Sequence, residues 1–299
     1  MGTNNLTDDN FTSQVVSVPL TLEQATSLII ERARQLVNRL VEQRGHETPP
    51  FLPEEFARLQ GIKRIEKADL RGTSAVMLRF QDGYVIKVNQ NHNLARQNFS
   101  CAHEIGHNLL RELKIELNTE NIEYRTFNPQ AHRKARVRAI ERLCDAAATE
   151  LLMPELVFKK YLSGFGVSVH SIERLASIFR VSIQAAAIRI AEVSTKPCIA
   201  LLWQPWIRTK SKGLRLAWCV GPGRNSRGKG YYIPLHTYVR PPSTLHKAYE
   251  YDSPVKCHKL FKRGTDVKHL PMESKGFGHG ETRYVISLAF PRDEVKQEY

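Results

Sequence analysis

The fold is decided by residues 96–110, which read Arg-Gln-Asn-Phe-Ser-Cys-Ala-His-Glu-Ile-Gly-His-Asn-Leu-Leu. The stretch holds no proline, and Gly106 is its one internal helix breaker, so it predicts a helix. On a helix, His103 and His107 share one face, with about 6 Å between their Cβ atoms. Two imidazoles placed in this way can converge on one metal ion, and Glu104 then lies beside that ion.

A second segment supplies the third protein ligand that a catalytic zinc ion needs. Residues 140–154 are rich in alanine and end at Pro154, which predicts a helix that stops there. Glu141 and Asp145 are four residues apart and share a face. Glu141 can therefore bind the metal while Asp145 accepts the outer N–H of a ligand histidine. Glu150 is a weaker candidate, because it lies roughly half a turn round the helix from Glu141.

Two motifs occur here in a fixed order. Residues 96–110 match Arg-x-x-Phe-x-x-Ala-His-Glu-x-Gly-His-x-Leu-Leu, and residues 141–154 match Glu-x-x-x-Asp-x-x-Ala-x-x-Leu-Leu-Met-Pro. Together they resemble the ImmA/IrrE family of zinc-dependent metallopeptidases, and the resemblance extends over residues 20–195. It implies a zincin-like peptidase core.

The resemblance also implies roles for single residues. The zinc ligands of that family correspond to His103, His107 and Glu141, and its general base corresponds to Glu104. Asp145 stands where the family more often has Asn, which leaves a hydrogen-bond acceptor in place. Manganese is a second candidate metal, although two imidazoles and a carboxylate suit zinc well.

These ligands predict a hydrolytic mechanism. Three protein ligands leave room for a water whose pKa falls toward about 7, and Glu104 can take its proton and pass it to the leaving amine. A structural zinc site is the alternative, with Cys101 or Cys144 closing the fourth position. Cys101 lies about 160° round the helix from His103, so we expect it to face the core.

The resemblance implies a substrate class as well. Members of the family cleave helix-turn-helix repressors of the XRE type, and so switch on DNA-damage responses or the excision of mobile elements. Two alternatives remain: a non-proteolytic anti-repressor that uses zinc as a scaffold, and a DNA-binding regulator that uses residues 171–190. Glu104 disfavours the first alternative. The Ala-rich second half of residues 171–190 disfavours the second.

Composition sets the broad class. The chain has 299 residues, of which 41% are hydrophobic, enough for two ordinary cores. Its five cysteines form no CxxC pair, and their odd number argues against a disulfide framework. Residues 1–19 lack the apolar region of a signal peptide, and no window approaches 18 apolar residues. We expect a cytoplasmic protein without membrane contact.

Charge is concentrated in the last third of the chain. The net charge is +14, and residues 196–299 account for +11 of it, with 19 Lys and Arg against 8 Asp and Glu. Such asymmetry predicts contact with nucleic acid or with another acidic partner. A solvated basic face is the alternative.

The predicted fold class is α+β, in four parts. Residues 1–19 form a flexible tail, and residues 20–155 a mainly helical, zincin-like metallopeptidase domain with a small β-sheet. Residues 156–195 form a helix-turn-helix-like segment, and residues 196–299 an antiparallel β domain. Some members of the family carry a GAF-like sensor domain at this place, which is an analogy of fold only.

Residues 20–155 contain several local signals. A helix is predicted from Thr21 to Gly45, with Thr21 and Gln24 forming a capping box, and a short helix over 53–59. Strands are predicted over 74–80 and 84–89, joined by a hairpin at Gln81-Asp82-Gly83. An edge strand could pair with an extended substrate peptide, although the hairpin could equally be structural support.

Residues 114–138 are predicted to form a long polar loop. Tyr124 or His132 within it could stabilise an oxyanion, although a surface role is favoured for each. Residues 171–190 predict two short helices capped by Ser171 and Ser182. The second helix offers only Gln184 and Arg189 to DNA, so packing is favoured over base readout.

The last third reads as short strands separated by Gly and Pro, at 198–203, 214–220, 231–235 and 283–290. The basic, Gly-rich loop 221–230 could grip a phosphate, although a hairpin tip is favoured. A second metal site is disfavoured, because the spacing of the remaining candidates fits no known pattern. Those candidates are Cys257, His258, His269 and His279.

Overall fold

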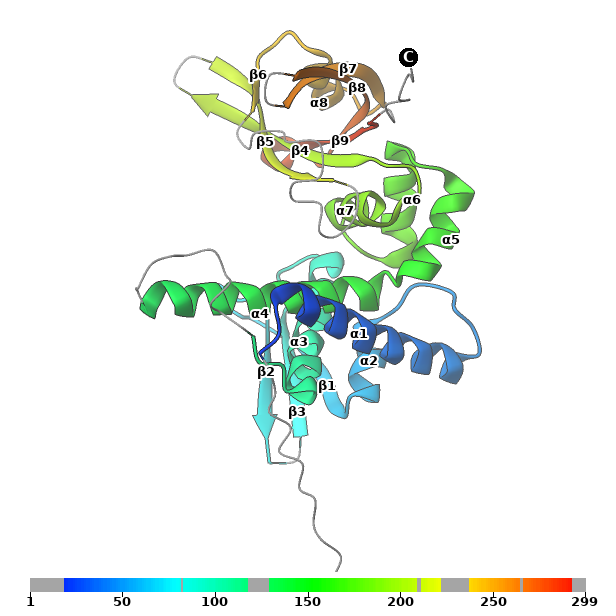
Figure 1. Cartoon of the computed structure of the whole chain (residues 1–299), viewed down its shortest axis with the longest axis vertical. Coiled ribbons are helices and arrows are strands. Elements are labelled where there is room, and N and C mark those ends of the chain that lie inside the picture. Colours follow the sequence, from blue (N-terminus) through cyan, green and yellow to red (C-terminus); the bar gives the residue numbers. More distant parts are fainter. Residues whose placement is uncertain are drawn as a thin grey trace, which may run out of the picture.

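The computed structural model describes residues 19–81, 83–117, 129–208, 211–221, 237–263 and 266–291. Helices dominate as far as residue 193, and strands dominate after it, which confirms the α+β class. In Figure 1 a lower unit of helices with a small sheet lies beneath a second, larger sheet, and helices α5 to α7 lie between the two.

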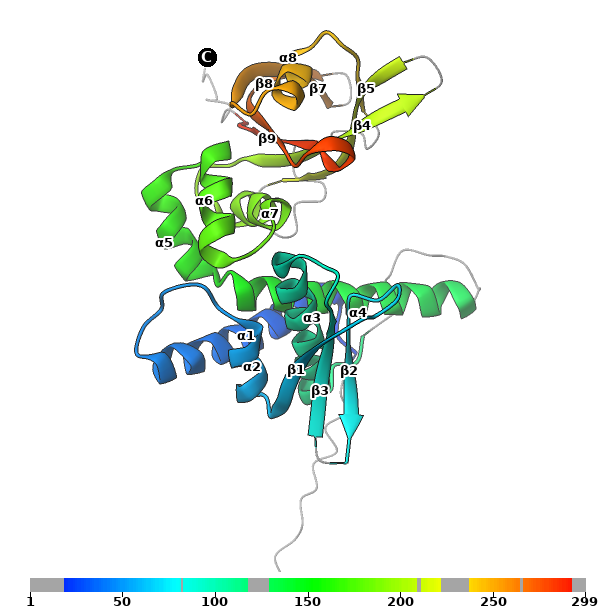
Figure 2. The same ribbon diagram turned by 180° about the vertical axis from the view of Figure 1, so that it is seen from behind.

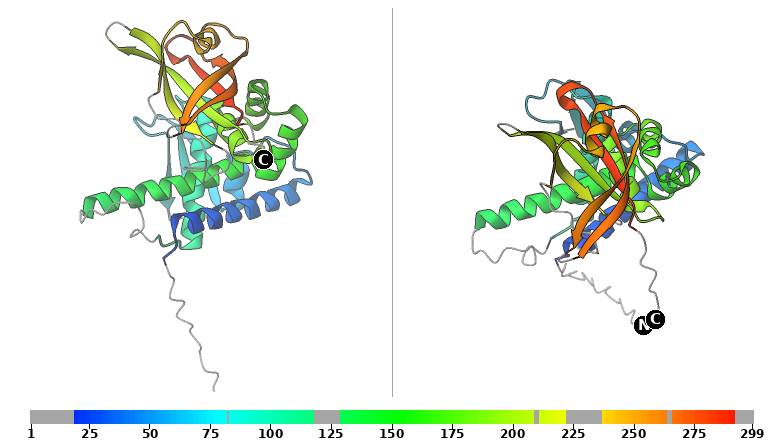
Figure 3. Two further views of the ribbon diagram at one scale, coloured as in Figure 1. Left: turned by 45° about the horizontal axis from the view of Figure 1, so that its top comes forward. Right: turned by 90° about the horizontal axis from the view of Figure 1, so that it is seen from above.

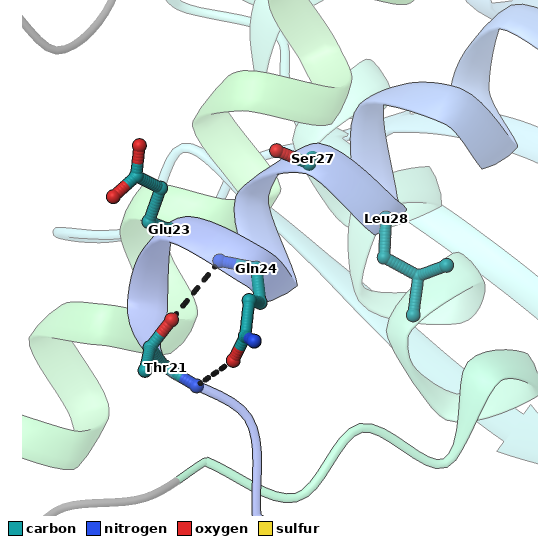
Figure 4. Close-up of a pocket in the computed structure, with 5 residues that line it drawn as sticks. All are labelled: Thr21, Glu23, Gln24, Ser27 and Leu28. Carbon is teal, nitrogen blue, oxygen red and sulfur yellow. Dashed lines mark hydrogen bonds between the residues drawn. The ribbon is translucent and has the colours of Figure 1, made fainter.

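Helix α1, Leu22–Arg44, begins and ends as predicted. The side chain of Thr21 accepts a hydrogen bond from the Gln24 backbone N–H at 3.2 Å, and the Gln24 side chain accepts one from the Thr21 backbone N–H at 2.9 Å (Figure 4). This capping box satisfies donors that the start of a helix would otherwise leave unpaired. Gly45 ends the helix in the left-handed conformation, at a φ of 72°. The short helix α2, Pro53–Leu59, is confirmed too.

A three-stranded sheet follows, in the order β1-β3-β2. Strands β2, Ala75–Phe80, and β3, Gly83–Asn89, pair antiparallel as the predicted hairpin, although Asp82 at its turn lies outside the described residues. Strand β1, Ile62–Ala68, pairs parallel with β3 and was not predicted. The sequence shows no alternation of apolar and polar residues here, because charged residues dominate the strand and Ile62 is its one fully buried position.

The two motif helices are α3, Leu94–Leu113, and α4, Pro129–Leu152, which pack against each other. The prediction of a loop over 114–138 is partly wrong, since α4 begins at Pro129. Proline is favoured at the first helical position, and the Arg, Lys and Ala residues that follow favour helix. Tyr124 and the side chain of His132 lie outside the described residues. Seen from behind, the small sheet lies in front of α3 (Figure 2).

Three short helices follow: α5, Glu155–Phe165, α6, Val169–Phe179, and α7, Ile183–Val193. Ser182 caps α7 as predicted. The predicted cap at Ser171 is wrong, because Ser168 caps α6 and Ser171 is buried inside the first turn.

Arg189 of α7 is fully buried. Its Nη2 lies 2.7 Å from a Glu150 carboxylate oxygen and donates to the Met153 carbonyl at 2.8 Å. Gln184 hydrogen-bonds to Tyr284 of the C-terminal sheet. Arg189 is therefore held inside the fold and Gln184 is tied to the C-terminal sheet, which agrees with the packing role favoured for α7.

The C-terminal sheet has the strand order β6-β5-β4-β9-β8-β7, and all its neighbours pair antiparallel, as predicted for this part of the chain. Its strands are β4, Ile199–Arg208, β5, Ser211–Val220, β6, Tyr238–Val239, β7, Val255–Arg263, β8, Asp266–Phe277, and β9, Tyr284–Ala289. Helix α8, Thr244–Glu250, and a 3₁₀ turn, Gly280–Thr282, complete it. The predicted strand 231–235, residues 222–230 of the Gly-rich loop and the side chains of His258 and His269 lie outside the described residues.

Both faces of strand β4 are buried. Ala200 and Leu202 of β4 belong to the core that runs through the helices. Ile199, Leu201 and Trp203 alternate with them and pack into a second cluster with residues of α8. Alternate side chains of β4 therefore point to opposite faces of the sheet, and those on one face attach the C-terminal sheet to the helical core.

The five cysteines are all free thiols, in agreement with the prediction that they form no disulfide framework. Among the helices of the described residues, none combines the length and the apolar character needed to cross a bilayer.

Candidate active site

Helix α3 presents His103, Glu104 and His107 on its partly buried face. Its opposite face is fixed in the core by Ala102, Ile105 and Leu109, which are completely buried. The ring centroids of the two histidines lie 5.0 Å apart, with the rings at 73° to each other. The helix therefore holds both imidazoles toward the same side, as the spacing predicted.

Helix α4 brings Glu141 to the two imidazoles. The Nε2 atom of His103 lies 3.2 Å from one Glu141 oxygen, and the Nε2 atom of His107 lies 3.7 Å from the other. Ligand atoms round a tetrahedral zinc ion are separated by about 3.3 Å. The donor set of two imidazoles and one carboxylate, at these separations, fits a divalent ion such as zinc.

Asp145 lies behind His103, as predicted. The Nδ1–H of His103 donates to Asp145 Oδ1 at 2.9 Å, which leaves Nε2 directed toward Glu141. Burial acts to lower the pKa of His103, but the Asp145 hydrogen bond and the nearby carboxylates outweigh it and raise that pKa. Burial, reinforced by the charge of His103, lowers the pKa of His107.

Gly106 allows the two motif helices to approach closely. A Cβ atom at Gly106 would lie 3.0 Å from both Cα and the carbonyl oxygen of Cys144, which are backbone atoms of α4. The sequence marks Gly106 only as a helix breaker. The structural reason for the glycine depends on a contact between two helices, which local sequence does not reveal.

Cys144 also lies near the histidines. Its sulfur and the ring nitrogens of His103 and His107 all lie within 4.8 Å of one another. Burial raises the pKa of the Cys144 thiol and so disfavours the thiolate that a metal binds, whereas the Glu141 carboxylate reaches both imidazoles. Cys101 faces the core, as predicted, and burial raises its pKa to about 12. Glu141 is therefore the better third donor.

Glu104 is held by the small sheet. Its Oε2 accepts a hydrogen bond from the backbone N–H of Met77 in β2 at 3.1 Å. Among the described strands, β3 is the one neighbour of β2, so this N–H points out of the sheet. The structure thus places an open strand edge directly beside Glu104, an arrangement that the sequence left undetermined.

A cavity of about 550 Å³ opens beside Glu104 and His107. It lies between the end of α3, the chain that follows it, and α4. Its apolar lining includes Leu110, Ile140 and Leu143. A cavity of this volume is typical of ligand-binding sites.

These side chains have the arrangement expected of a peptidase metal site, and comparisons with known proteins point to the same class of protein. Residues 61–191 match the sequence profile of the IrrE N-terminal-like domain. The matched segment contains both motifs, so this part of the chain is similar to the N-terminal domain of the ImmA/IrrE metallopeptidases.

Two curated relatives are similar to part of the chain. The radiation response metalloprotease IrrE of Deinococcus radiodurans is 33% identical over 128 residues, which cover 40% of this chain and 35% of that protein. The protein of the same name from Deinococcus deserti is 34% identical over 116 residues, which cover 39% of each chain. The match therefore spans well under half of these relatives.

One solved structure shares the overall fold. A transcriptional regulator of Mycobacterium tuberculosis superposes with a TM-score of 0.55 at 13% sequence identity. The superposition covers 91% of this chain and 81% of that one. At this identity the likeness concerns the fold alone.

Proposed function

We propose that the protein is a zinc-dependent endopeptidase. The observation that carries the proposal is the convergence of His103, His107 and Glu141 beside Glu104 and an open strand edge. His103, His107 and Glu141 are the proposed metal ligands, and zinc is favoured over manganese for this donor set. Asp145 orients His103 and fixes its tautomer.

When bound, the metal supplies Lewis acidity for a peptide carbonyl and lowers the pKa of a water. Glu104 is the proposed general base, and it holds the proton of that water until the leaving amine takes it. The Met77 N–H keeps the carboxylate of Glu104 oriented. An extended substrate can add to the open edge of β2 through backbone hydrogen bonds.

The proposed substrate is a helix-turn-helix repressor of the XRE type. Its cleavage would derepress a DNA-damage, stress or mobile-element response in the cytoplasm. Support comes from the match to the IrrE N-terminal-like domain and from relatives named radiation response metalloproteases. We further propose that the core is zincin-like and that the six-stranded C-terminal sheet is a GAF-like sensor, since its packing onto α6 and α7 gives it a route to the core.

The decisive experiment compares new protein N-termini in host cells that express the wild type or Glu104→Gln, at rest and after DNA damage. One new terminus inside a helix-turn-helix repressor, present with the wild type alone, is the expected result. If both forms alter transcription equally and no new terminus appears, the chain is the non-proteolytic anti-repressor.

Contact with nucleic acid is proposed for the C-terminal part, from its net charge of +11. The full-length Glu104→Gln protein should bind DNA or RNA with an affinity that falls as salt rises. Absence of salt-dependent binding would remove this part of the proposal. A DNA-binding role of residues 171–190 has little support, because Arg189 is buried and Gln184 is bonded to Tyr284.

A further inference from the structure

The cavity beside Glu104 has a charged rim. Three cationic side chains line it: Arg111 and Lys114 from the end of α3, and Arg136 from α4. All three residues are exposed. Besides the base Glu104, one acidic residue, Glu116, belongs to the described lining. The cavity is therefore apolar within and mainly basic at its rim.

Two of these cations have no structural task. Within the described part of the chain, neither Lys114 nor Arg136 takes part in an ion pair. Arg111 is held differently, since its guanidinium lies 4.8 Å from the centre of the Tyr84 ring. Unpaired cations that face one hollow create a positive potential, which attracts an acidic ligand.

The basic character continues along α4. Residues 133–142 of this helix contain four arginines and one lysine, against Glu141 alone as an acidic residue. In Figure 1 and Figure 3 the N-terminal half of α4, which holds most of these residues, projects beyond α1 and α3. A segment that leaves the cavity therefore meets further positive charge.

The open edge of β2 borders the same space. Met77 lines the cavity and also donates its outward N–H to Glu104. A peptide that pairs with this edge runs past the cavity, because Met77 belongs to both. Side chains of an extended strand point alternately to its two faces. One side chain can then enter the apolar interior while its neighbours reach the rim.

We propose that this cleft selects an acidic peptide segment, with an apolar residue beside the bond that is cleaved. Leu110, Ile140 and Leu143 receive the apolar side chain. Lys114 and Arg136 pair with carboxylates a few positions along the segment. The inference rests on the proposed peptidase function and names the substrate chemistry that the site accepts.

The test uses full-length, zinc-loaded Glu104→Gln protein, immobilised and exposed to a pool of random decapeptides at low salt. Retained peptides are sequenced by mass spectrometry. Acidic residues should be enriched roughly threefold to tenfold, as expected for one or two exposed charge pairs, and the enrichment should fade at high salt. A Lys114→Glu/Arg136→Glu variant should lose it and favour basic peptides instead.

Arg138→Glu is the matched control, since Arg138 lies on the same exposed part of α4 but does not line the cavity. It should leave the selected peptides unchanged. The inference would be overturned if all variants showed equal enrichment, or if the retained peptides were not acidic. It would also be overturned if no peptide were retained, or if these cations captured nucleic acid alone. The assay needs no cleavage. If acidic peptides are retained but the wild type leaves them intact, the proposed peptidase function fails while the inferred peptide selectivity stands.

Discussion

His103 donates from Nδ1 to Asp145 Oδ1 over 2.9 Å, across the contact between α3 and α4. The bond fixes which ring nitrogen of His103 remains for a metal. It also joins the two motifs, because Asp145 lies one helical turn after Glu141. The carboxylate therefore sets the tautomer of one imidazole and links the two helices that carry the proposed ligands.

Removing this carboxylate should weaken metal binding. Asp145→Ala should lower zinc affinity by about 10-fold to 100-fold, the usual effect of losing a partner of a ligand histidine. Asp145→Asn keeps an acceptor for Nδ1–H and should lose less. Competition with a chelating dye measures both affinities. Equal affinity of all three proteins would show that Asp145 does not orient the ligand.

Gly106→Ala should destabilise the protein. The added Cβ would lie 3.0 Å from backbone atoms of Cys144, so α3 and α4 must separate. We expect a loss of about 1–3 kcal/mol in the free energy of unfolding, as for other overpacked contacts, and weaker zinc binding. Urea denaturation followed by circular dichroism measures the stability.

Gly164 provides the control for this experiment. It lies in helix α5, and a Cβ there would meet nothing within 4 Å. Gly164→Ala should therefore leave stability unchanged or raise it by up to about 1 kcal/mol, the helix preference of alanine over glycine. Similar losses in both variants would assign the Gly106 effect to helix propensity instead of to packing.

The spacing of the two motifs predicted the local geometry of the site well. His103 with His107, and Glu141 with Asp145, lie four residues apart on exposed or partly buried faces, and the structure brings all four side chains together. Helical spacing carried this information because each pair lies on a single helix. Their roles in catalysis stay predictions.

Contacts between distant elements could not be predicted in this way. The bond from the Met77 N–H to Glu104 and the fit of Gly106 against Cys144 depend on how separate elements pack. Strand β7 was missed for a different reason: lysines recur along 255–263 and obscure any apolar pattern, and its strand pairing is with β8, which the sequence did not predict either.

Chelation should destabilise the folded protein, because a ligand that binds only the folded state adds to its stability. With zinc at a thousand times its dissociation constant, the gain is about 4 kcal/mol. Thermal unfolding with and without EDTA measures the shift in Tm. Glu141→Ala should lose the shift and Glu104→Gln should keep it. The reverse pattern would contradict the proposed ligand set.

The buried pair of Arg189 and Glu150 should be among the most sensitive positions in the fold. Arg189 is 0% exposed and Glu150 is 1% exposed, and Arg189 also donates to the Met153 carbonyl at the end of α4. Arg189→Met leaves Glu150 Oε2 opposite an apolar side chain, while Oε1 keeps its bonds to Arg34 and to the Glu155 backbone N–H. We expect a loss of up to about 3–5 kcal/mol, the usual effect of removing one partner of a buried ion pair, with the Arg34 contact offsetting part of it.

A second substitution distinguishes the ion pair from simple packing. Glu150→Leu together with Arg189→Met removes both charges, so the double variant should recover much of the stability lost by Arg189→Met alone. Because Arg189 lies on α7 and Glu150 on α4, the single variant should also loosen the attachment of the C-terminal sheet. Faster hydrogen exchange in α7 and β4 would report that loosening. Exchange confined to α4 would argue that α7 is held mainly by its apolar face.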